Sequence, residues 1–249
     1  MNIRSALPPA LLAAASKISG FIGSKISGPS NPVRNPECSE FEVDGWNLSR
    51  FIVGKLIPVV GVHPFPLQEL MLMSAAVVRL RPSLIFEWGT NIGKSARIFY
   101  EVANYYSVPL IVHSIDLPDE IDHVEHPRSG RGFMVRKIKS VKLHQGDGLT
   151  TSLRLWQEAG SPSRPMFFID GDHSYESVKR ELEGIVAAVP DPFLLLHDTF
   201  FQSSEAAYNL GPYTAIVEFL ERYPGRFSRV QTGFSLPGMT LLIPVSIQL

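Results

Sequence analysis

From Ser83 onward, short apolar runs alternate with segments whose apolar residues recur at helical spacing, and this alternation limits the possible folds more than any other feature. Five runs have the length and composition of strands: LIFEW, LIVHSID, VKLHQGD, MFFIDGD and FLLLHDT. Helical patterns follow the first, third and fourth runs, and over residues 175–189 the apolar side chains fall on one face. Almost continuously apolar strands that alternate with helices predict an α/β fold, in which helices cover both faces of a parallel sheet.

Composition divides the chain into two parts. Residues 27–37, SGPSNPVRNPE, are rich in proline and have little to bury, which is typical of a linker. We therefore expect an N-terminal extension and linker over residues 1–37 and one domain over residues 38–249, with its core at about 60–243. Pro64 and Pro66 predict a helix that begins near Leu67. Near the C-terminus, FSRVQTG and GMTLLIPV have strand-like patterns around a Gly/Pro turn, which fits a strand pair at the end of the sheet.

Charge and hydropathy exclude several classes of partner. Lysine and arginine number 23 against 24 acidic residues, so no overall field favours nucleic acid or an anionic membrane, and we expect neither as a partner. The longest apolar runs fall short of the roughly 20 residues that span a bilayer, which predicts no transmembrane segment. Arg4 followed by LPPALLAAAS could pass for a signal peptide, but Lys17 follows closely and Cys38 is the single cysteine. We expect a cytoplasmic protein.

Acidic residues follow or end all five predicted strands. Because ligands of such sheets bind beyond the carboxyl ends of the strands, these side chains should converge on one crevice. Any one of them could instead cap the helix that follows its strand, since aspartate is a preferred N-cap residue. The five residues are Glu87, Asp116, Asp147, Asp170 and Asp198.

The segment GTNIGKS looks at first like a phosphate-binding loop, but its spacing is wrong. A P-loop has four residues between its first glycine and Gly-Lys-Ser/Thr, whereas three residues separate Gly89 from Gly93. The dinucleotide pattern G-x-G-x-x-G also fails, because Glu87 and Ile92 stand where its first and third glycines should be. What remains is E-x-G-x-x-x-G, in which the carboxylate suits a ligand that carries a cation rather than a phosphate.

S-adenosylmethionine is such a ligand, because it has an ammonium group, a sulfonium and a ribose but no phosphate. Asp116 closes the second strand 27 residues after Gly89, where a carboxylate can accept hydrogen bonds from both ribose hydroxyls. Asp147, in the sequence QGDG, follows the third strand and could approach the adenine edge.

Five blocks in order, EWGTNIGKSA, SID, GDG, FFIDGDHSYESV and LLLHDT, resemble a class I S-adenosylmethionine-dependent methyltransferase. The IDGDHSYE block is similar to the group that includes cephalosporin-hydroxylase-like and related O-methyltransferases. The resemblance implies a Rossmann-like, seven-stranded, mostly parallel sheet with helices on both faces and an antiparallel last strand. It implies S-adenosyl-L-methionine as cofactor, with Asp116 on the ribose. The implied cofactor loop consists of Glu87, Gly89, Thr90, Gly93 and Ser95.

Asp170 and Asp198 lie at the ends of strands that are neighbours in this topology, and His197 precedes Asp198. Two carboxylates and a third ligand form a plausible site for Mg²⁺ or another divalent metal, which would acidify a coordinated hydroxyl. In the metal-dependent O-methyltransferases that the chain resembles, the last ligands are usually an adjacent acid/amide pair. Here the sequence reads His197–Asp198–Thr199, and an imidazole suits Mn²⁺ or Zn²⁺ better than Mg²⁺.

His173 lies three residues after Asp170, where the resembling enzymes place a basic side chain that takes the proton of the methyl acceptor. The other interpretation is that residues 172–174 cap a helix beginning near Tyr175. We interpret His173 and Asp170 as the candidate catalytic residues.

The expected function is transfer of a methyl group from S-adenosylmethionine to a hydroxyl of a small-molecule acceptor, with a metal as an optional aid. A homo-oligomer is compatible with the sequence. Two alternatives stay open: a nucleoside-triphosphatase that uses GTNIGKS with FFIDGD as its magnesium strand, and a non-catalytic module that keeps the cofactor fold.

Overall fold

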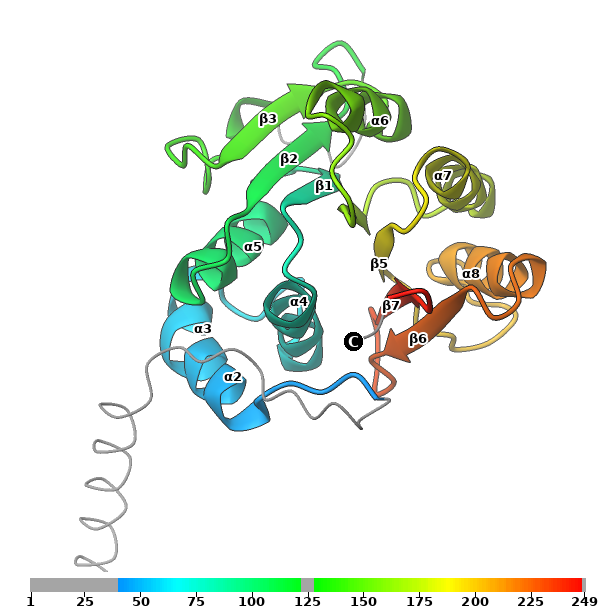
Figure 1. Cartoon of the computed structure of the whole chain (residues 1–249), viewed down its shortest axis with the longest axis horizontal. Coiled ribbons are helices and arrows are strands. Elements are labelled where there is room, and N and C mark those ends of the chain that lie inside the picture. The colour runs from blue at the N-terminus through cyan, green and yellow to red at the C-terminus, as the bar shows by residue number, and fades with distance from the viewer. Residues whose placement is uncertain (1–39, 122–127, 248–249) are drawn as a thin grey trace, which may run out of the picture.

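One seven-stranded sheet, in the order β3-β2-β1-β4-β5-β7-β6, organises the residues that the computed structural model describes, 40–121 and 128–247 (Figure 1). Strands β1 to β5 pair in parallel, and β7 lies antiparallel between β5 and β6. The predicted α/β class, the strand pair at the end of the sheet and the antiparallel last strand are all confirmed. The strands are β1 (Leu84–Trp88), β2 (Ile111–Asp116), β3 (Val141–Gln145), β4 (Met166–Ile169), β5 (Phe193–His197), β6 (Phe227–Gln231) and β7 (Met239–Pro244).

Helices cover both faces of this sheet, as Figure 1 shows: α4 and α5 lie on one side, and α6, α7 and α8 lie on the other. The helix predicted to begin near Leu67 is α4, and the segments predicted to follow the first, third and fourth strands are α5, α6 and α7. The larger helices are α4 (Leu67–Leu80), α5 (Lys94–Tyr105), α6 (Gly148–Glu158), α7 (Tyr175–Ala188) and α8 (Leu210–Arg222).

A chain of short helices before α4 was not predicted. It consists of α2 (Gly45–Phe51), the π-helix η2 (Ile52–Leu56) and α3 (Ile57–Val60); a single 3₁₀ turn, η3 (Arg128–Gly130), lies between β2 and β3. Asp44 caps α2 by accepting a hydrogen bond from the amide of Asn47. Residues 1–39 lie outside the described residues, so the N-terminal extension stays a prediction.

The pleat of the central strands builds two cores, because successive side chains of a strand point to opposite faces. Ile85 and Phe168 belong to the core under α4 and α5, whereas Phe86 and Phe167 belong to the core under α6, α7 and α8. Burial on both faces explains why these strands are apolar throughout. No helix within residues 40–121 and 128–247 is long and apolar enough to cross a membrane.

Replacing Phe168 by alanine tests the importance of the first core. Phe168 is fully buried against the rings of Phe65 and Phe99. The Phe168→Ala variant should lower the free energy of unfolding by about 3–5 kcal/mol through lost burial and cavity formation. Phe234, which is 84% exposed, offers the matched control: Phe234→Ala should change little in the same denaturant titration. Equal losses in the two variants would contradict this description of the core.

Candidate active site

The five predicted acids lie along one edge of the sheet, because parallel strands end together. Glu87 lies within β1 and Asp116 ends β2, while Asp170 and Asp198 directly follow β4 and β5. Asp147 follows β3 and begins α6. The predicted placement at the carboxyl edge is therefore present, whereas none of the five acids lines the cavity of about 840 Å³ at the ends of β2 and β3, so one shared crevice stays a prediction.

The glycine loop after β1, residues 89–93, lies against the end of β4. Gly89 has φ +90°, and a Cβ added there would lie 2.3 Å from the carbonyl oxygen of Asp170. Gly93, with φ +86°, precedes α5, and its added Cβ would lie 2.8 Å from the side chain of Val135. Lys94 donates a hydrogen bond to the carbonyl of His63 and does not point into the loop as a P-loop lysine would. Only glycine at position 89 lets the loop lie this close to the end of β4, because any side chain there would clash with the carbonyl oxygen of Asp170.

Glu87 is completely buried behind the loop and is held by hydroxyl groups. Ser114 donates to Oε1 of Glu87, and the hydroxyls of Ser114 and Thr90 lie 2.6 Å apart. Burial raises the pKa of Glu87 to about 8, against the opposing effect of the Ser114 and Ser95 hydroxyls. Its second oxygen, Oε2, is buried and has no hydrogen-bond partner in the described part of the chain. A buried carboxyl oxygen without a donor is costly and is suited to receive one from a ligand.

Asp116 is oriented by two backbone amides and an arginine. It accepts hydrogen bonds from the amides of Leu117 at 2.9 Å and Asn91 at 3.2 Å, and its Oδ2 lies 3.3 Å from Nε of Arg131. Arg131 also contacts Asp119 at 2.7 Å. Arg131 was not predicted from the sequence, because it belongs to the long connection between β2 and β3 rather than to a strand end.

Asp147 is engaged as a helix cap. Its Oδ1 accepts from the amide of Thr150 at 2.8 Å, and its Oδ2 pairs with Arg180 of α7 at 2.7 Å. Burial opposes ionisation, but the hydrogen bond from Arg180 outweighs it and lowers the pKa of Asp147 to about 2. The capping role that the sequence left open is therefore present, with both oxygens occupied.

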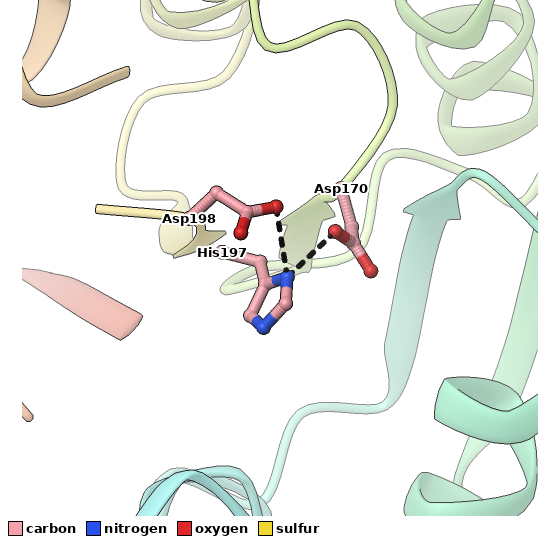
Figure 2. Close-up of side chains that lie close together, drawn as sticks. All are labelled: Asp170, His197 and Asp198. Carbon is pink, nitrogen blue, oxygen red and sulfur yellow. Dashed lines mark hydrogen bonds and ion pairs between the residues drawn. The ribbon is translucent and has the colours of Figure 1, made fainter. Parts of the chain in front are cut away.

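Asp170, His197 and Asp198 come together at the ends of β4 and β5, each offering one ligand atom within 4.8 Å of the others (Figure 2). Nδ1 of His197 lies 2.9 Å from Oδ1 of Asp170 and 3.1 Å from Oδ2 of Asp198. Asp198 has φ +57°, a left-handed conformation that aspartate tolerates better than most residues. This backbone turn directs its carboxylate back toward the histidine.

His173 joins the same cluster from the loop between β4 and α7. Its Nε2 lies 2.9 Å from Oδ2 of Asp198 and 3.6 Å from Oδ1 of Asp170. The hydroxyl of Tyr208 donates to Asp198 at 3.4 Å and was not predicted as a site residue. Ser174, not His173, accepts the capping hydrogen bond at the start of α7. The imidazole is thus free of the cap and faces the two carboxylates.

Glu69 of α4 is a buried site residue that the sequence analysis missed. Its Oε2 lies 2.9 Å from Nε2 of His197, and its Oε1 accepts from the amide of Gly238 at 2.8 Å. A sequence signal was present: Glu69 lies four residues before Met73 and seven before Ala76, on the face of α4 that enters the core. An acid on such a face needs a buried partner.

Attraction between the aspartates and the histidines of the cluster lowers the pKa of both aspartates and raises the pKa of both histidines. Burial works against ionisation of Asp170, but the charge of His197 and the hydrogen bond with His173 lower the pKa of Asp170 overall. Burial is likewise outweighed for Asp198, whose pKa is lowered by both histidines. Burial opposes the charged form of His173, yet the two aspartates raise its pKa to about 10, and the pKa of His197 is raised well above its ordinary value for the same reason.

A cavity of about 840 Å³ lies beside the ends of β2 and β3 rather than over the aspartate–histidine cluster. Arg131, Asp119 and Gln145 are among its lining residues. Asp116 and its partner Arg131 are thus on the side of the glycine loop where the cavity lies, and Asp170 and Asp198 are on the other.

The strand order, the antiparallel β7 and the loop after β1 define a Rossmann-like methyltransferase fold. Residues 61–234 match the model of the family described as Rhamnosyl O-methyltransferase/CmcI, and the chain belongs to this family. This membership sets aside the nucleoside-triphosphatase alternative.

The relatives are distant. The chain is 24% identical over 154 residues to a rhamnosyl O-methyltransferase of Mycobacterium leprae (strain TN). The match covers 61% of this chain and 64% of the mycobacterial protein, so the chain spans less than two thirds of that relative's length. An O-methyltransferase of Bacillus cereus in complex with S-adenosylhomocysteine (SAH) superposes with a TM-score of 0.51 at 16% identity, covering 79% of this chain and 90% of that one. The O-methyltransferase TomG of Streptomyces achromogenes in complex with S-adenosylmethionine (SAM) gives 0.50 at 16% identity, covering 80% and 88%. At these identities the solved structures show the shared fold.

The close approach at Gly89 leads to a stability prediction with a matched control. Gly89 and Gly160 both have left-handed φ values, +90° and +83°, but an added Cβ meets a backbone oxygen only at Gly89. Gly160→Ala should cost about 1 kcal/mol from backbone strain alone. Gly89→Ala should cost clearly more in chemical denaturation, because the turn and the end of β4 must move apart. Equal costs would show that the two backbones do not touch.

Glu87 makes stability depend on pH. With a pKa of about 8 in the folded chain against an ordinary value of 4.5, protonated Glu87 favours the folded state, and this stability is lost as pH rises from about 4.5 through 8. The slope is about 1.4 kcal/mol per pH unit within that window. Glu87→Gln should remove this slope, while Glu176→Gln, at an exposed position of α7, should keep it. Thermal unfolding at pH 5, 6, 7 and 8 measures both; parallel pH profiles for wild type and Glu87→Gln would contradict the prediction.

Proposed function

We propose that this chain transfers a methyl group from S-adenosylmethionine to a hydroxyl oxygen of a small molecule, with a sugar hydroxyl as the class of acceptor. The family model and the relative named as a rhamnosyl O-methyltransferase support this proposal. The observation that carries it is the contact at Gly89: the turn proposed to hold the cofactor lies against Asp170, which belongs to the aspartate–histidine cluster. The residues proposed to bind the cofactor and those proposed to bind the acceptor would thus lie on either side of the contact between the backbones of Gly89 and Asp170.

The proposed cofactor residues lie at the ends of β1, β2 and β3. When bound, S-adenosylmethionine supplies an electrophilic methyl group on its sulfonium. Gly89 and Gly93 keep the turn close to Asp170 and Val135, and the orphan oxygen Oε2 of Glu87 would accept a hydrogen bond from the ammonium group of the cofactor. Thr90 and Ser95 support Glu87, the first through Ser114 and the second as a neighbouring hydroxyl.

Asp116 and Asp147 complete the proposed cofactor side. Two backbone amides already orient the carboxylate of Asp116, which would accept hydrogen bonds from the ribose hydroxyls. Asp147 fixes the turn after β3 through its cap and its pairing with Arg180, and in this way shapes the adenine end of the site.

Asp170 and His173 would align the acceptor and remove its proton. They are the more exposed members of the cluster, at 17% and 22%, so an acceptor hydroxyl can reach them more easily than Asp198, which is 2% exposed. The neutral ring of His173 would accept the hydroxyl proton, and the two aspartates, which face its buried Nε2, would stabilise the imidazolium that forms. The same aspartates favour a proton on the resting ring, so His173 must lose that proton before it accepts another.

Substitutions in the cluster test this assignment. His173→Ala and Asp170→Asn should each lower turnover by about 10²–10⁴-fold, as expected for a lost general base or orienting group. Binding of S-adenosylhomocysteine should stay within about twofold of wild type, because neither side chain belongs to the proposed cofactor side. Asp191→Asn, before β5 at the opposite edge of the sheet, is the matched control and should be fully active.

The assay uses methyl-labelled S-adenosylmethionine with free sugars, nucleotide sugars, glycosides and phenols as acceptors. Label on a sugar oxygen supports the proposal. Tight binding of S-adenosylhomocysteine with no labelled product from any acceptor class would instead favour the non-catalytic module. A homo-oligomer stays a prediction, which sedimentation velocity checks.

A further inference from the structure

The oxygens that would hold a divalent ion converge instead on a ring nitrogen. Oδ1 of Asp170 and Oδ2 of Asp198 lie 2.9 and 3.1 Å from Nδ1 of His197, and Figure 2 shows both contacts. His173 closes the arrangement, with its Nε2 at 2.9 Å from Asp198 and 3.6 Å from Asp170. Two carboxylate oxygens and two imidazole nitrogens therefore alternate around a closed ring of four titratable groups.

As placed, these residues do not fit an ion held through His197. A metal bonded to an imidazole lies along the nitrogen lone pair at about 2.0–2.1 Å. Oδ1 of Asp170 already makes a hydrogen bond to Nδ1 at 2.9 Å, so an ion in that direction would collide with the oxygen. The second nitrogen is also engaged, because Nε2 lies 2.9 Å from Oε2 of Glu69. A carboxylate opposite each nitrogen calls for an N–H on each, and such a ring has no lone pair for a metal.

The contacts of Glu69 explain why the imidazole of His197 is held between carboxylates. Its side chain is fully buried, and the amide of Gly238 fixes its other oxygen at 2.8 Å. The edge of the His197 ring that faces α4 therefore meets a carboxyl oxygen held in place, and the ring of Phe65 packs against the imidazole with centroids 4.9 Å apart. The imidazole is held between carboxylates from α4, β4 and β5.

We propose that His197, held by Glu69, takes the place of a divalent ion between Asp170 and Asp198, so that this chain carries out methyl transfer without a metal. The proposal rests on the proposed function for its catalytic part. Nδ1 of His197 lies between the oxygens of Asp170 and Asp198 that an ion would otherwise hold together. The imidazole thus fixes the orientation of Asp170, while Glu69 acts as a positioning residue.

The first test measures metal binding directly and needs no turnover. The full chain, stripped with a chelator, is titrated at pH 7 with Mn²⁺, Mg²⁺ and Zn²⁺ by calorimetry, together with Asp170→Asn and Asp198→Asn. We expect no one-to-one binding at this cluster, and any binding that both variants retain lies elsewhere and agrees with the proposal. One-to-one binding that both variants abolish would overturn it.

The second test tries to restore an ion site. His197→Glu replaces the ring by an acid beside Asp198, and His197→Glu with Glu69→Gln does so with less repulsion among buried carboxylates. Whichever variant melts cooperatively and binds S-adenosylhomocysteine should bind Mn²⁺ at least tenfold more tightly than wild type. If both fold and neither gains binding, the cluster cannot exchange a histidine for an ion and the proposal fails. If neither folds, the first titration alone decides.

Turnover separates this inference from the proposed function. Wild-type activity should be the same with and without chelator, whereas loss of activity in chelator, regained with Mn²⁺ or Mg²⁺, would overturn the metal-free reading. Absence of activity under all conditions would remove the proposed function and leave the metal titration to decide the inference.

Glu69→Gln tests the positioning role while keeping the shape of the side chain. It should lower kcat about tenfold or more with an unchanged Kd for S-adenosylhomocysteine. Glu181→Gln, at a buried acid of α7 outside the cluster, is the matched control and should keep wild-type kcat. Wild-type kcat in Glu69→Gln, or an equal loss in the control, would contradict a positioning role.

Discussion

Burial of like charges is the constraint on which this edge of the sheet depends. Glu69 and Asp198 are almost completely removed from solvent, and Asp170 lies beside them. Carboxylates in such a place are stable only when each oxygen has a donor or an opposite charge. His173 and His197 supply a partner to Oδ1 of Asp170 and Oδ2 of Asp198, whereas Oδ1 of Asp198 is buried without a hydrogen-bond partner in the described part of the chain. The arrangement of the aspartate–histidine cluster thus follows from the pairing of carboxylates with imidazoles as much as from backbone topology.

The glycine loop solves a different problem on the other side of the edge. Gly89 removes a side chain where two backbones touch, and Glu87 lies behind it, buried in a mainly uncharged state at neutral pH. A positively charged ligand is the natural partner of a carboxyl group that can release its proton on binding. In the proposed function the loop would therefore favour a cationic ligand, and Glu87 offers no comparable partner to a chain of phosphates.

Much of the fold could be predicted from sequence, because strand burial, helical periodicity and the E-x-G-x-x-x-G spacing are local. The strand-end acids were also found, since parallel topology brings them together. Glu69 could not be assigned, because its partner His197 lies 128 residues away and only tertiary packing joins them. Asp147 was ambiguous for another reason: an N-cap and a ligand-binding acid look the same in sequence. Arg131 gave no signal, since a long connection carries no periodicity.

The hydrogen bond from Gly238 to Glu69 has a consequence for how the chain can vary. Gly238 lies in the turn that joins the last two strands, and an added Cβ there would meet Phe200 at 2.5 Å. The C-terminal hairpin is therefore a structural anchor for α4 and, through it, for the imidazole at the end of β5. Changes of length in this turn would disturb a distant hydrogen-bond network, whereas the connection between β5 and α8, where residues 200–206 are half-buried or exposed, can accommodate them more easily.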